Sequence, residues 1–204
     1  MGFYKEQVLP RVLNHAMDTK FEREVRPRVC SGLHGQVVEI GFGTGLNTPY
    51  YPSEVTKVFA IEPSNVAMKL AAPRLAASSA PVELAGLTGE QIDLPSEQFD
   101  AVLSTWTLCA IPNLPAALAE IRRVLKPNGT FHFVEHGYAP DVGVAKWQAR
   151  LEGLNERVVG CHLDRKIDEC IAQAGFTFDA LDTFYAKGAP KPVGFMYEGR
   201  ARKT

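Results

Sequence analysis

The segment GQVVEIGFGTGLN, residues 35–47, decides how this chain folds. Its first part, VVEI (37–40), is a short run rich in β-branched residues, which predicts a buried strand. The glycines that follow it are Gly41, Gly43 and Gly45. Glycines here let the chain turn sharply and let a ligand lie against bare backbone, although a tight turn without a ligand has the same pattern. The segment therefore predicts the first strand of a sheet and a turn that can bind a ligand.

The rest of the chain alternates between strand-like and helix-like segments. Further strands are predicted at residues 57–61, 81–84, 99–104, 130–135, 176–184 and 194–201. Helices are predicted at 3–29 (one or two), 64–77, 115–125, 144–159 and 165–174, with the turn KPNG (126–129) ending the third of these segments. Strands separated by helices indicate a parallel sheet covered on both faces. The last two strands have no predicted helix between them, so we expect an α/β fold whose sheet ends antiparallel.

Composition excludes several classes of protein. The 204 residues include 22 basic and 23 acidic side chains, so the net charge of −1 gives no bulk attraction to nucleic acid. The four cysteines form no CxxC pair and suggest no disulfide scaffold, which favours a reducing, cytoplasmic compartment.

No segment is predicted to span a membrane. The longest stretch without a charged residue, 101–119, is interrupted by Pro112, Asn113 and Pro115. Residues 3–29 mix basic and apolar side chains. We expect them to pack on the core as a lid, and a weak contact with a membrane surface is the alternative.

Two carboxylates near the glycine turn indicate which ligand it binds. Glu62 closes the second strand, where a carboxylate typically binds ribose hydroxyls. The dinucleotide pattern GxGxxG needs a glycine where Leu46 stands, and Glu39 beside the turn would repel a diphosphate. A ligand with an ammonium group, a ribose and no phosphate fits better, which indicates S-adenosylmethionine. A carboxylate at position 39 that caps the loop's own amides, or a nicotinamide-dependent oxidoreductase, is the alternative.

These features together resemble the class I S-adenosylmethionine-dependent methyltransferases. The resemblance rests on VVEIGFGTG (37–45), FAIEPS (59–64), TGEQIDLPSEQFDAV (88–102) and LKPNGTFHFVEHG (125–137). With STWTLCAIPN (104–113), GCHLDR (160–165) and AGF (174–176), the chain is similar to small bacterial relatives of the alkyl-thiol methyltransferases. The resemblance implies a Rossmann-like seven-stranded sheet with the cofactor across the carboxyl ends of strands one to four.

The resemblance also implies a set of cofactor-binding residues. They are Glu39, Gly41, Phe42, Gly43, Gly45, Asn47, Glu62, Pro63, Ser64, Thr88, Gly89, Glu90, Thr105 and Trp106. Glu39 is expected near the amino group and Glu62 at the ribose, while Pro63 and Ser64 flank the adenine. Thr88 stands where the family usually has Asp, so the hydrogen bond to the adenine amine comes from its hydroxyl or is missing. Thr105 and Trp106 should border the methionine tail and the reactive methyl.

Methyl transfer from a sulfonium is an in-line displacement, so positioning and water exclusion do most of the work. A protein must add only a base for a thiol, hydroxyl or amine acceptor. His136 is the candidate base and Glu135 its orienting partner; a structural histidine bonded to a loop carbonyl is the alternative.

Several residues are expected to contact the acceptor. They are Cys109, His162 and Tyr185, although a lone cysteine such as Cys109 is often only buried packing. The expected acceptor is a small apolar molecule, with a thiol favoured over a phospholipid or a quinone or phenol. A non-catalytic cofactor-binding module is a further alternative. The spacing of Cys161, His162, Asp164 and Cys170 matches no standard zinc module, so no metal is expected. The resemblance instead implies that Cys161 and His162 lie in the cap over the acceptor.

The chain shows no internal repeat, low-complexity tract or linker, which predicts one domain over residues 1–204. Within it we expect an N-terminal helical lid (1–35), a cofactor-binding core (36–137), and acceptor-side helices with a terminal hairpin (138–204).

Overall fold

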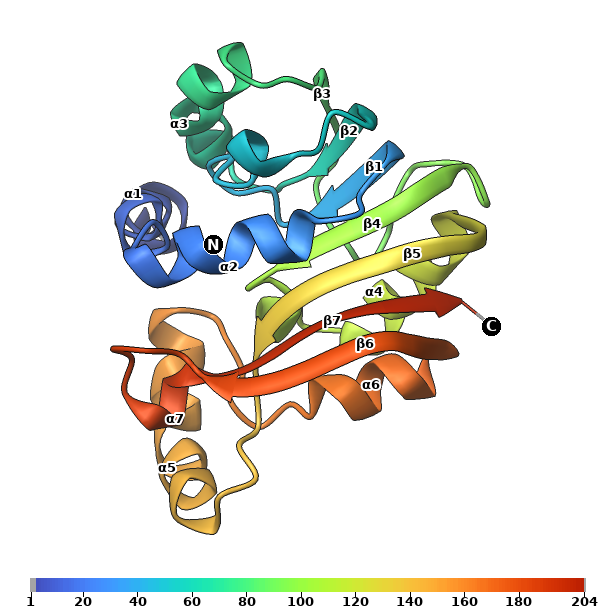
Figure 1. Cartoon of the computed structure of the whole chain (residues 1–204). Helices are drawn as coiled ribbons and strands as arrows, with labels where there is room; N and C mark the ends of the chain where they lie inside the picture. Colours follow the sequence, from blue (N-terminus) through green and yellow to red (C-terminus); the bar gives the residue numbers. More distant parts are fainter. Residues whose placement is uncertain (1–2, 204) are drawn as a thin grey trace.

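A seven-stranded sheet forms the centre of the computed structural model, which describes residues 3–203 (Figure 1). The strands are β1 (Gly35–Ile40), β2 (Val55–Ile61), β3 (Val82–Gly86), β4 (Phe99–Thr105), β5 (Leu125–His136), β6 (Phe176–Tyr185) and β7 (Phe195–Lys203). Their order is β3-β2-β1-β4-β5-β7-β6; β1 to β5 pair in parallel, and β7 is antiparallel to both of its neighbours. The predicted Rossmann-like sheet is therefore confirmed. Residues 1, 2 and 204, which end the predicted domain, lie outside the described residues.

Helices form where the apolar periodicity predicts them. The α-helices are α1 (Leu9–Ala16), α2 (Lys20–Cys30), α3 (Asn65–Ala76), α4 (Leu114–Val124), α5 (Val142–Val158), α6 (Ile167–Gln173) and α7 (Lys191–Gly194). Shorter turns are the π-helix η1 (Tyr4–Val8) and the 3₁₀ helices η2 (Thr48–Tyr50) and η3 (Leu108–Ala110). Side chains cap the starts of several helices. The Ser64 hydroxyl accepts from Ala67 N–H at α3, the Asn113 amide oxygen accepts from Ala116 N–H at α4, and Thr19 and Glu22 form a capping box at α2.

Two details differ from the prediction. The KPNG turn does not precede β5 but interrupts it, because Phe99 pairs with Leu125 and Ala101 pairs with Thr130. Asn128 has a φ of 66°, which lets the intervening residues loop out of the ladder. The connection between β6 and β7 also contains one helical turn, α7, where no helix was expected; it is too short to show apolar periodicity.

Helices cover both faces of the sheet, as predicted. Figure 1 shows α2 crossing one face and α4 and α6 on the other. Val25 and Val29 of α2 pack on Val37, Val58 and Leu103. On the opposite face, α4 and α6 bury a larger core, which includes Val38, Val102, Phe131, Phe133, Leu118, Ile121 and Ile171. Burial of these apolar side chains is the main source of stability for the sheet.

The parallel arrangement brings the carboxyl ends of β1, β2, β4 and β5 to one edge of the sheet. In Figure 1 this edge faces α1 and the loops that lead into α5 and α7. Ligands of open α/β sheets bind at such an edge, where the strand order reverses. Here the reversal lies between β1 and β4, directly after the glycine turn.

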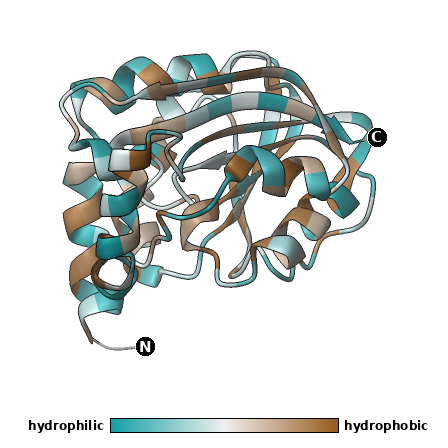
Figure 2. Cartoon of the chain, turned by 90° about the horizontal axis from the view of Figure 1, so that it is seen from below, coloured by the Kyte–Doolittle hydropathy of each residue, from teal (hydrophilic) through white to brown (hydrophobic). Residues whose placement is uncertain are grey.

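Along the described residues, no helix combines the length and the apolar character that crossing a membrane requires. The N-terminal helix is amphipathic and exposes several large apolar side chains: Phe3, Tyr4, Val8 and Val12. Figure 2 shows hydrophobic and hydrophilic residues alternating along the helix that begins beside the N label.

Candidate active site

The three glycines after β1 all adopt positive φ angles: 71° at Gly41, 58° at Gly43 and 74° at Gly45. A Cβ on Gly41 would lie 2.1 Å from Oγ1 of Thr107, and one on Gly45 would lie 3.2 Å from the Phe42 ring. A Cβ on Gly43 would meet only the Gly41 carbonyl oxygen, at 3.8 Å. Two glycines are thus required by protein packing, whereas Gly43 faces open space in which a ligand can lie against the backbone.

Glu62 closes this turn. Its Oε2 accepts from the N–H of Gly43 at 2.7 Å, and its Oε1 accepts from the N–H of Ser64 at 2.8 Å. Burial raises the pKa of Glu62, and these two backbone bonds partly oppose the rise. Each carboxylate oxygen has a second lone pair, so the group can still accept a bond from a hydroxyl of a ligand.

Glu39 is buried, and its partners differ from those expected. Asn47 Nδ2 donates to Glu39 Oε1 at 2.9 Å, and the Tyr51 hydroxyl donates to Oε2. Arg26 Nη1 donates to Asn47 Oδ1 at 2.5 Å and so extends the network into α2. We expected a cationic ligand or backbone amides at this carboxylate, but two side chains of the chain itself bond it. The carboxylate that caps the amides of the loop is Glu62.

Burial raises the pKa of Glu39 to about 7, although Tyr51, Asn47 and the charge of Arg26 oppose the rise. Because the folded value lies above the unfolded one, the folded protein holds this proton more tightly. The resulting stability is present below about pH 4.5 and is lost as pH rises through about 7.

We therefore expect Glu39→Gln to become more stable relative to the wild type as pH rises from 5 to 8. The gain in the free energy of unfolding is on the order of 3 kcal/mol at most, from the size of the pKa shift. Urea unfolding of both proteins at several pH values measures it. A difference that does not change with pH would contradict the assignment of the raised pKa to Glu39.

The segment after β3, residues 88–90, is held in place by hydrogen bonds and packing of its own residues. Thr88 is exposed, and its hydroxyl accepts from the N–H of Glu90 at 3.2 Å. Glu90 Oε1 accepts from the N–H of Asn113 at 2.5 Å and ties the segment to the start of α4. Gly89 is buried, and a Cβ there would lie 2.9 Å from Ile40. Pro63 is exposed beside Glu62, on the same edge of the sheet.

The end of β4 continues the site. The Thr105 hydroxyl oxygen accepts from Asn47 Nδ2 at 3.0 Å, so one amide joins β4 to the glycine turn. Trp106 has a φ of 51°, which is rare for a bulky residue and is typical of functional sites. Its ring packs against the Arg26 guanidinium, 4.9 Å from the ring centroid. Thr105 and Trp106 therefore border the glycine turn with one polar and one aromatic side chain.

Glu135 and His136 end β5; Glu135 is buried and His136 is partly buried. Glu135 Oε1 accepts from the Ser104 hydroxyl at 2.8 Å and from the Thr107 N–H at 3.0 Å, while its Oε2 has no hydrogen-bond partner among residues 3–203. Burial raises the pKa of Glu135 to about 7. Nδ1 of His136 is likewise buried and has no hydrogen-bond partner within the described part of the chain. His136 is therefore not bonded to a loop carbonyl through Nδ1, the role that a structural histidine would have.

The structure brings His136 together with two cysteines. The Sγ atoms of Cys109 and Cys161 and one ring nitrogen of His136 lie within 4.8 Å of one another. Burial lowers the pKa of His136, but contact with the Cys161 thiol and the charge of Glu135 outweigh it, so the net shift is upward. The Cys109 thiol and then the His136 ring lower the pKa of Cys161 to about 5, against the effect of burial.

His162 and Tyr185 also reach the carboxyl edge, but their polar atoms have partners. Nδ1 of His162 lies 2.8 Å from Glu152 Oε1, and the Tyr185 hydroxyl donates to Asp141 at 2.5 Å. The backbone N–H of His162 donates to the Cys109 carbonyl at 2.9 Å. His162 thus lies beside Cys109, whereas Tyr185 ends β6, two strands away from β5.

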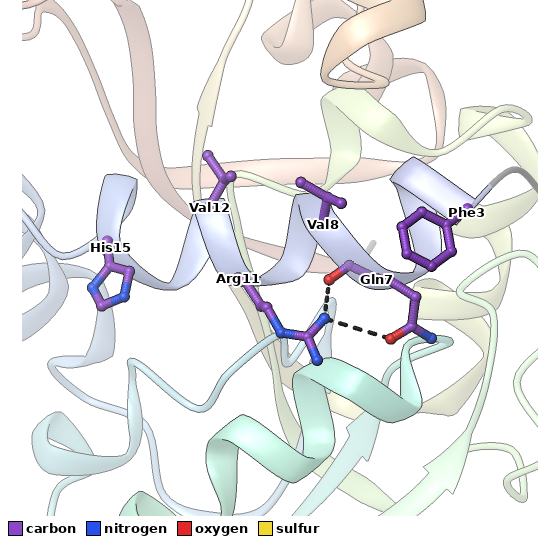
Figure 3. Close-up of a pocket in the computed structure, with 6 residues that line it drawn as sticks. All are labelled: Phe3, Gln7, Val8, Arg11, Val12 and His15. Carbon is purple, nitrogen blue, oxygen red and sulfur yellow. Dashed lines mark hydrogen bonds between the residues drawn. The ribbon is translucent and has the colours of Figure 1, made fainter.

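A separate pocket lies on the N-terminal segment (Figure 3). It is lined by Phe3, Gln7, Val8, Arg11, Val12 and His15. Val8 and Val12 point to one side of the helix in Figure 3, and Arg11 and His15 point to the other. None of these residues belongs to the glycine turn, so the pocket is distinct from the site described above.

Sequence reasoning missed two residues of the site, Arg26 and Tyr51. Arg26 and Tyr51 are separated in sequence from Glu39, and no spacing rule links them to it. The resemblance placed Cys161 with His162 near the acceptor, and the structure brings its sulfur close to Cys109 and His136. The sequence contained one signal for the contact between Cys109 and His136. They lie at the ends of neighbouring parallel strands, and such ends must lie close together.

Comparisons with known proteins identify relatives that are methyltransferases. A family of proteins described as "Methyltransferase domain" matches residues 38–133. The thiol S-methyltransferase TMT1B of Rattus norvegicus is 31% identical over 172 residues, which cover 82% of this chain and 70% of the relative. The phosphatidylethanolamine N-methyltransferase of Cereibacter sphaeroides is 29% identical and covers 68% of each chain.

Among solved structures, the N-methyltransferase NodS of Bradyrhizobium japonicum, crystallised with S-adenosylhomocysteine, superposes with a TM-score of 0.68. It is 16% identical, and the match covers 97% of this chain and 93% of NodS. These findings favour methyl transfer over the nicotinamide-dependent alternative. The chain belongs to the class I S-adenosylmethionine-dependent methyltransferases, is related to the alkyl-thiol methyltransferases, and uses S-adenosylmethionine as its cofactor.

Proposed function

We propose that this enzyme methylates the sulfur of a small, mostly apolar thiol. The observation that carries the proposal is the position of His136: it ends β5, next to the strand that ends in Thr105, so a candidate base lies on the edge that holds the glycine turn. The similarity to a thiol S-methyltransferase over most of the chain supports the same acceptor.

The residues around the glycine turn fit the cofactor. The open space at Gly43 and the carboxylate of Glu62 match a ligand with a ribose that presses against bare backbone. We propose that the cofactor contacts the set expected from the sequence: Glu39, Gly41, Phe42, Gly43, Gly45, Asn47, Glu62, Pro63, Ser64, Thr88, Gly89, Glu90, Thr105 and Trp106. Glu39 is held by Asn47 and Tyr51, and the second lone pair of each of its oxygens could accept a bond from the amino group of the cofactor.

Hydrogen bonds of the N-terminal helices support the expected division of the domain. We propose that residues up to 35 form a lid over the cofactor edge. Arg26 of α2 bonds Asn47, and Arg74 of α3 donates both to Asn14 of α1 and to the Thr44 carbonyl. These bonds fasten both N-terminal helices to the glycine turn and would exclude water from it.

When bound, the cofactor supplies a methyl group on a sulfonium, which is electrophilic without further activation. The chain has to position the acceptor and remove one proton. His136 would accept the proton of the thiol, and Glu135 would orient the imidazole and stabilise its charge. A thiol needs the least help, because its pKa lies only about one to two units above neutrality.

The acceptor would lie against Cys109, His162 and Tyr185, on the side of the edge formed by residues 138–203. His162 is placed beside Cys109 by the bond from its N–H. Tyr185 packs its ring on Phe195 at 5.1 Å, which adds apolar surface to the same edge. These side chains favour a small apolar acceptor over a charged one.

A phospholipid amine or a quinone or phenol hydroxyl is the second candidate acceptor. The similarity to a phosphatidylethanolamine N-methyltransferase favours it. So does the exposed apolar side of the N-terminal helix, where Phe3, Val8 and Val12 lie near Lys5 and Arg11. This surface would allow a weak contact with anionic membranes. The free cysteines fit a reducing, cytoplasmic location.

We expect purified enzyme to transfer labelled methyl groups to small alkyl thiols and to turn over no phenol or aminophospholipid at a comparable rate. A panel of these acceptors, assayed with radiolabelled S-adenosylmethionine, measures the preference. Turnover on phenols or lipid amines without any turnover on thiols would overturn the proposed acceptor and leave the methyltransferase assignment intact.

A further inference from the structure

Three side chains from separate segments meet near the carboxyl ends of β4 and β5. Cys109 belongs to η3 after β4, His136 ends β5, and Cys161 follows α5. Cys109 is fully buried and Cys161 is 8% exposed. The donor atoms, two sulfurs and one imidazole nitrogen, lie within 4.8 Å of one another, and His136 is partly buried.

Two polar atoms beside this group have no partner in the part of the chain that the structure describes: Nδ1 of His136 and Oε2 of Glu135. Leaving a buried polar atom unpaired costs about 1–3 kcal/mol. Native proteins rarely keep such atoms without a reason, and a bound ion is one of the established reasons. A ligand bound beside these two atoms would remove this cost.

The donor set matches a particular class of ion. Thiolate and imidazole ligands select Zn²⁺ and similar thiophilic metals over Mg²⁺ or Ca²⁺. Zn–S bonds of about 2.3 Å in a tetrahedron place two sulfurs about 3.8 Å apart. The present separations, all under 4.8 Å, would have to contract by about 1 Å at most. Two thiolates also balance the charge of a divalent ion, so the buried site would carry no net charge.

We propose that Cys109, His136 and Cys161 bind a thiophilic divalent metal ion, represented by Zn²⁺. Both thiols release their protons to solvent, and the sulfurs coordinate as thiolates together with one nitrogen of His136. With three protein ligands, the fourth position stays open to water or another ligand, as in catalytic rather than structural zinc sites.

The backbone around the donors is already held in place. The Cys109 carbonyl accepts from the N–H of His162 at 2.9 Å, and the Cys161 carbonyl accepts from Asn155 Nδ2 at 2.6 Å. Arg165 also donates to the Leu108 carbonyl. Hydrogen bonds therefore fix η3, which carries Cys109, to the segment that carries Cys161, and this lowers the cost of organising a metal site.

This site goes beyond the proposed function and does not depend on the acceptor. A bound ion would occupy a nitrogen of the residue proposed to accept the proton, so the two roles would exclude each other at any one moment. Metal binding must for this reason be tested by a signal other than methyl transfer.

The test is a titration of reduced, metal-free protein with Co²⁺, which reports sulfur ligands by its absorption. We expect one equivalent to produce thiolate-to-cobalt charge-transfer bands and tetrahedral d–d bands that Zn²⁺ abolishes by displacement. Cys109→Ala, Cys161→Ala and His136→Ala should each weaken binding by at least about 100-fold, more than loss of an outer-shell partner does. Cys170→Ala removes a free cysteine outside the group and should bind as the wild type does.

A folded wild type that gives no cobalt–thiolate absorption would overturn the site, as would variants that bind unchanged. Because a variant can fail to fold, a second measurement uses only the wild type. Zn²⁺ should slow alkylation of Cys109 and Cys161, quantified by mass spectrometry, and leave Cys170 unaffected. Equal alkylation rates of these two cysteines with and without Zn²⁺ would also rule the site out.

Discussion

Gly43→Val is expected to weaken the binding of S-adenosylhomocysteine by at least roughly 100-fold, which corresponds to about 2.7 kcal/mol. A side chain at Gly43 would enter the open space above the glycine turn, where only one protein atom lies within 4 Å of the added Cβ. The valine would therefore collide with the ligand and not with the protein. Isothermal titration calorimetry measures the loss.

The positive φ of Gly43 means that valine also strains the backbone, by about 1–2 kcal/mol. Gly188→Val is the matched control, because Gly188 has a φ of 86° and a Cβ there would meet nothing within 4 Å. It lies in the loop between β6 and α7, away from the glycine turn. Both variants should lose similar thermal stability, but only Gly43→Val should lose affinity. If Gly43→Val bound S-adenosylhomocysteine with unchanged affinity, the ligand would not lie at this turn.

His136→Ala should lower the turnover of a thiol acceptor by roughly 10²–10⁴-fold, the usual contribution of a positioned proton acceptor. The affinity for S-adenosylhomocysteine should change less than about twofold, because His136 ends β5 and the cofactor set lies around β1, β2 and β4. Single-turnover kinetics and calorimetry measure the two quantities on metal-free protein. Using metal-free protein ensures that the loss of turnover reports proton transfer and not metal binding.

His34→Ala provides the control for a changed histidine, since His34 lies before β1, at the opposite end of that strand from the glycine turn. It should leave both turnover and affinity unaltered. If His136→Ala reduced affinity and turnover to the same extent, His136 would be a structural residue of the edge and not a proton acceptor.

Most of the fold could be predicted from local patterns. β-branched runs bounded by glycine mark strands such as Val55–Ile61, and capped periodic segments mark helices such as Leu114–Val124. The KPNG loop inside β5 could not be predicted, because its position depends on the pairing of Leu125 with Phe99 across the sheet. Pairing of this kind is a tertiary property that the local pattern does not contain.

The site was predictable only where its residues share a strand end. The glycine turn and Glu62 follow directly from β1 and β2, and the bond from Gly43 to Glu62 joins them. The partners of Glu39 could not be found, because Tyr51 and Asn47 reach it through the path of the loop. Cys161 comes from a loop after α5, whose docking on the edge depends on packing over the whole chain.

The most direct test of the whole account is a calorimetric titration of the wild-type enzyme with S-adenosylhomocysteine and, separately, with NAD. The glycine turn closed by Glu62 should bind one equivalent of S-adenosylhomocysteine with micromolar or tighter affinity and should give no binding heat with NAD. Binding of NAD without binding of S-adenosylhomocysteine would contradict the account.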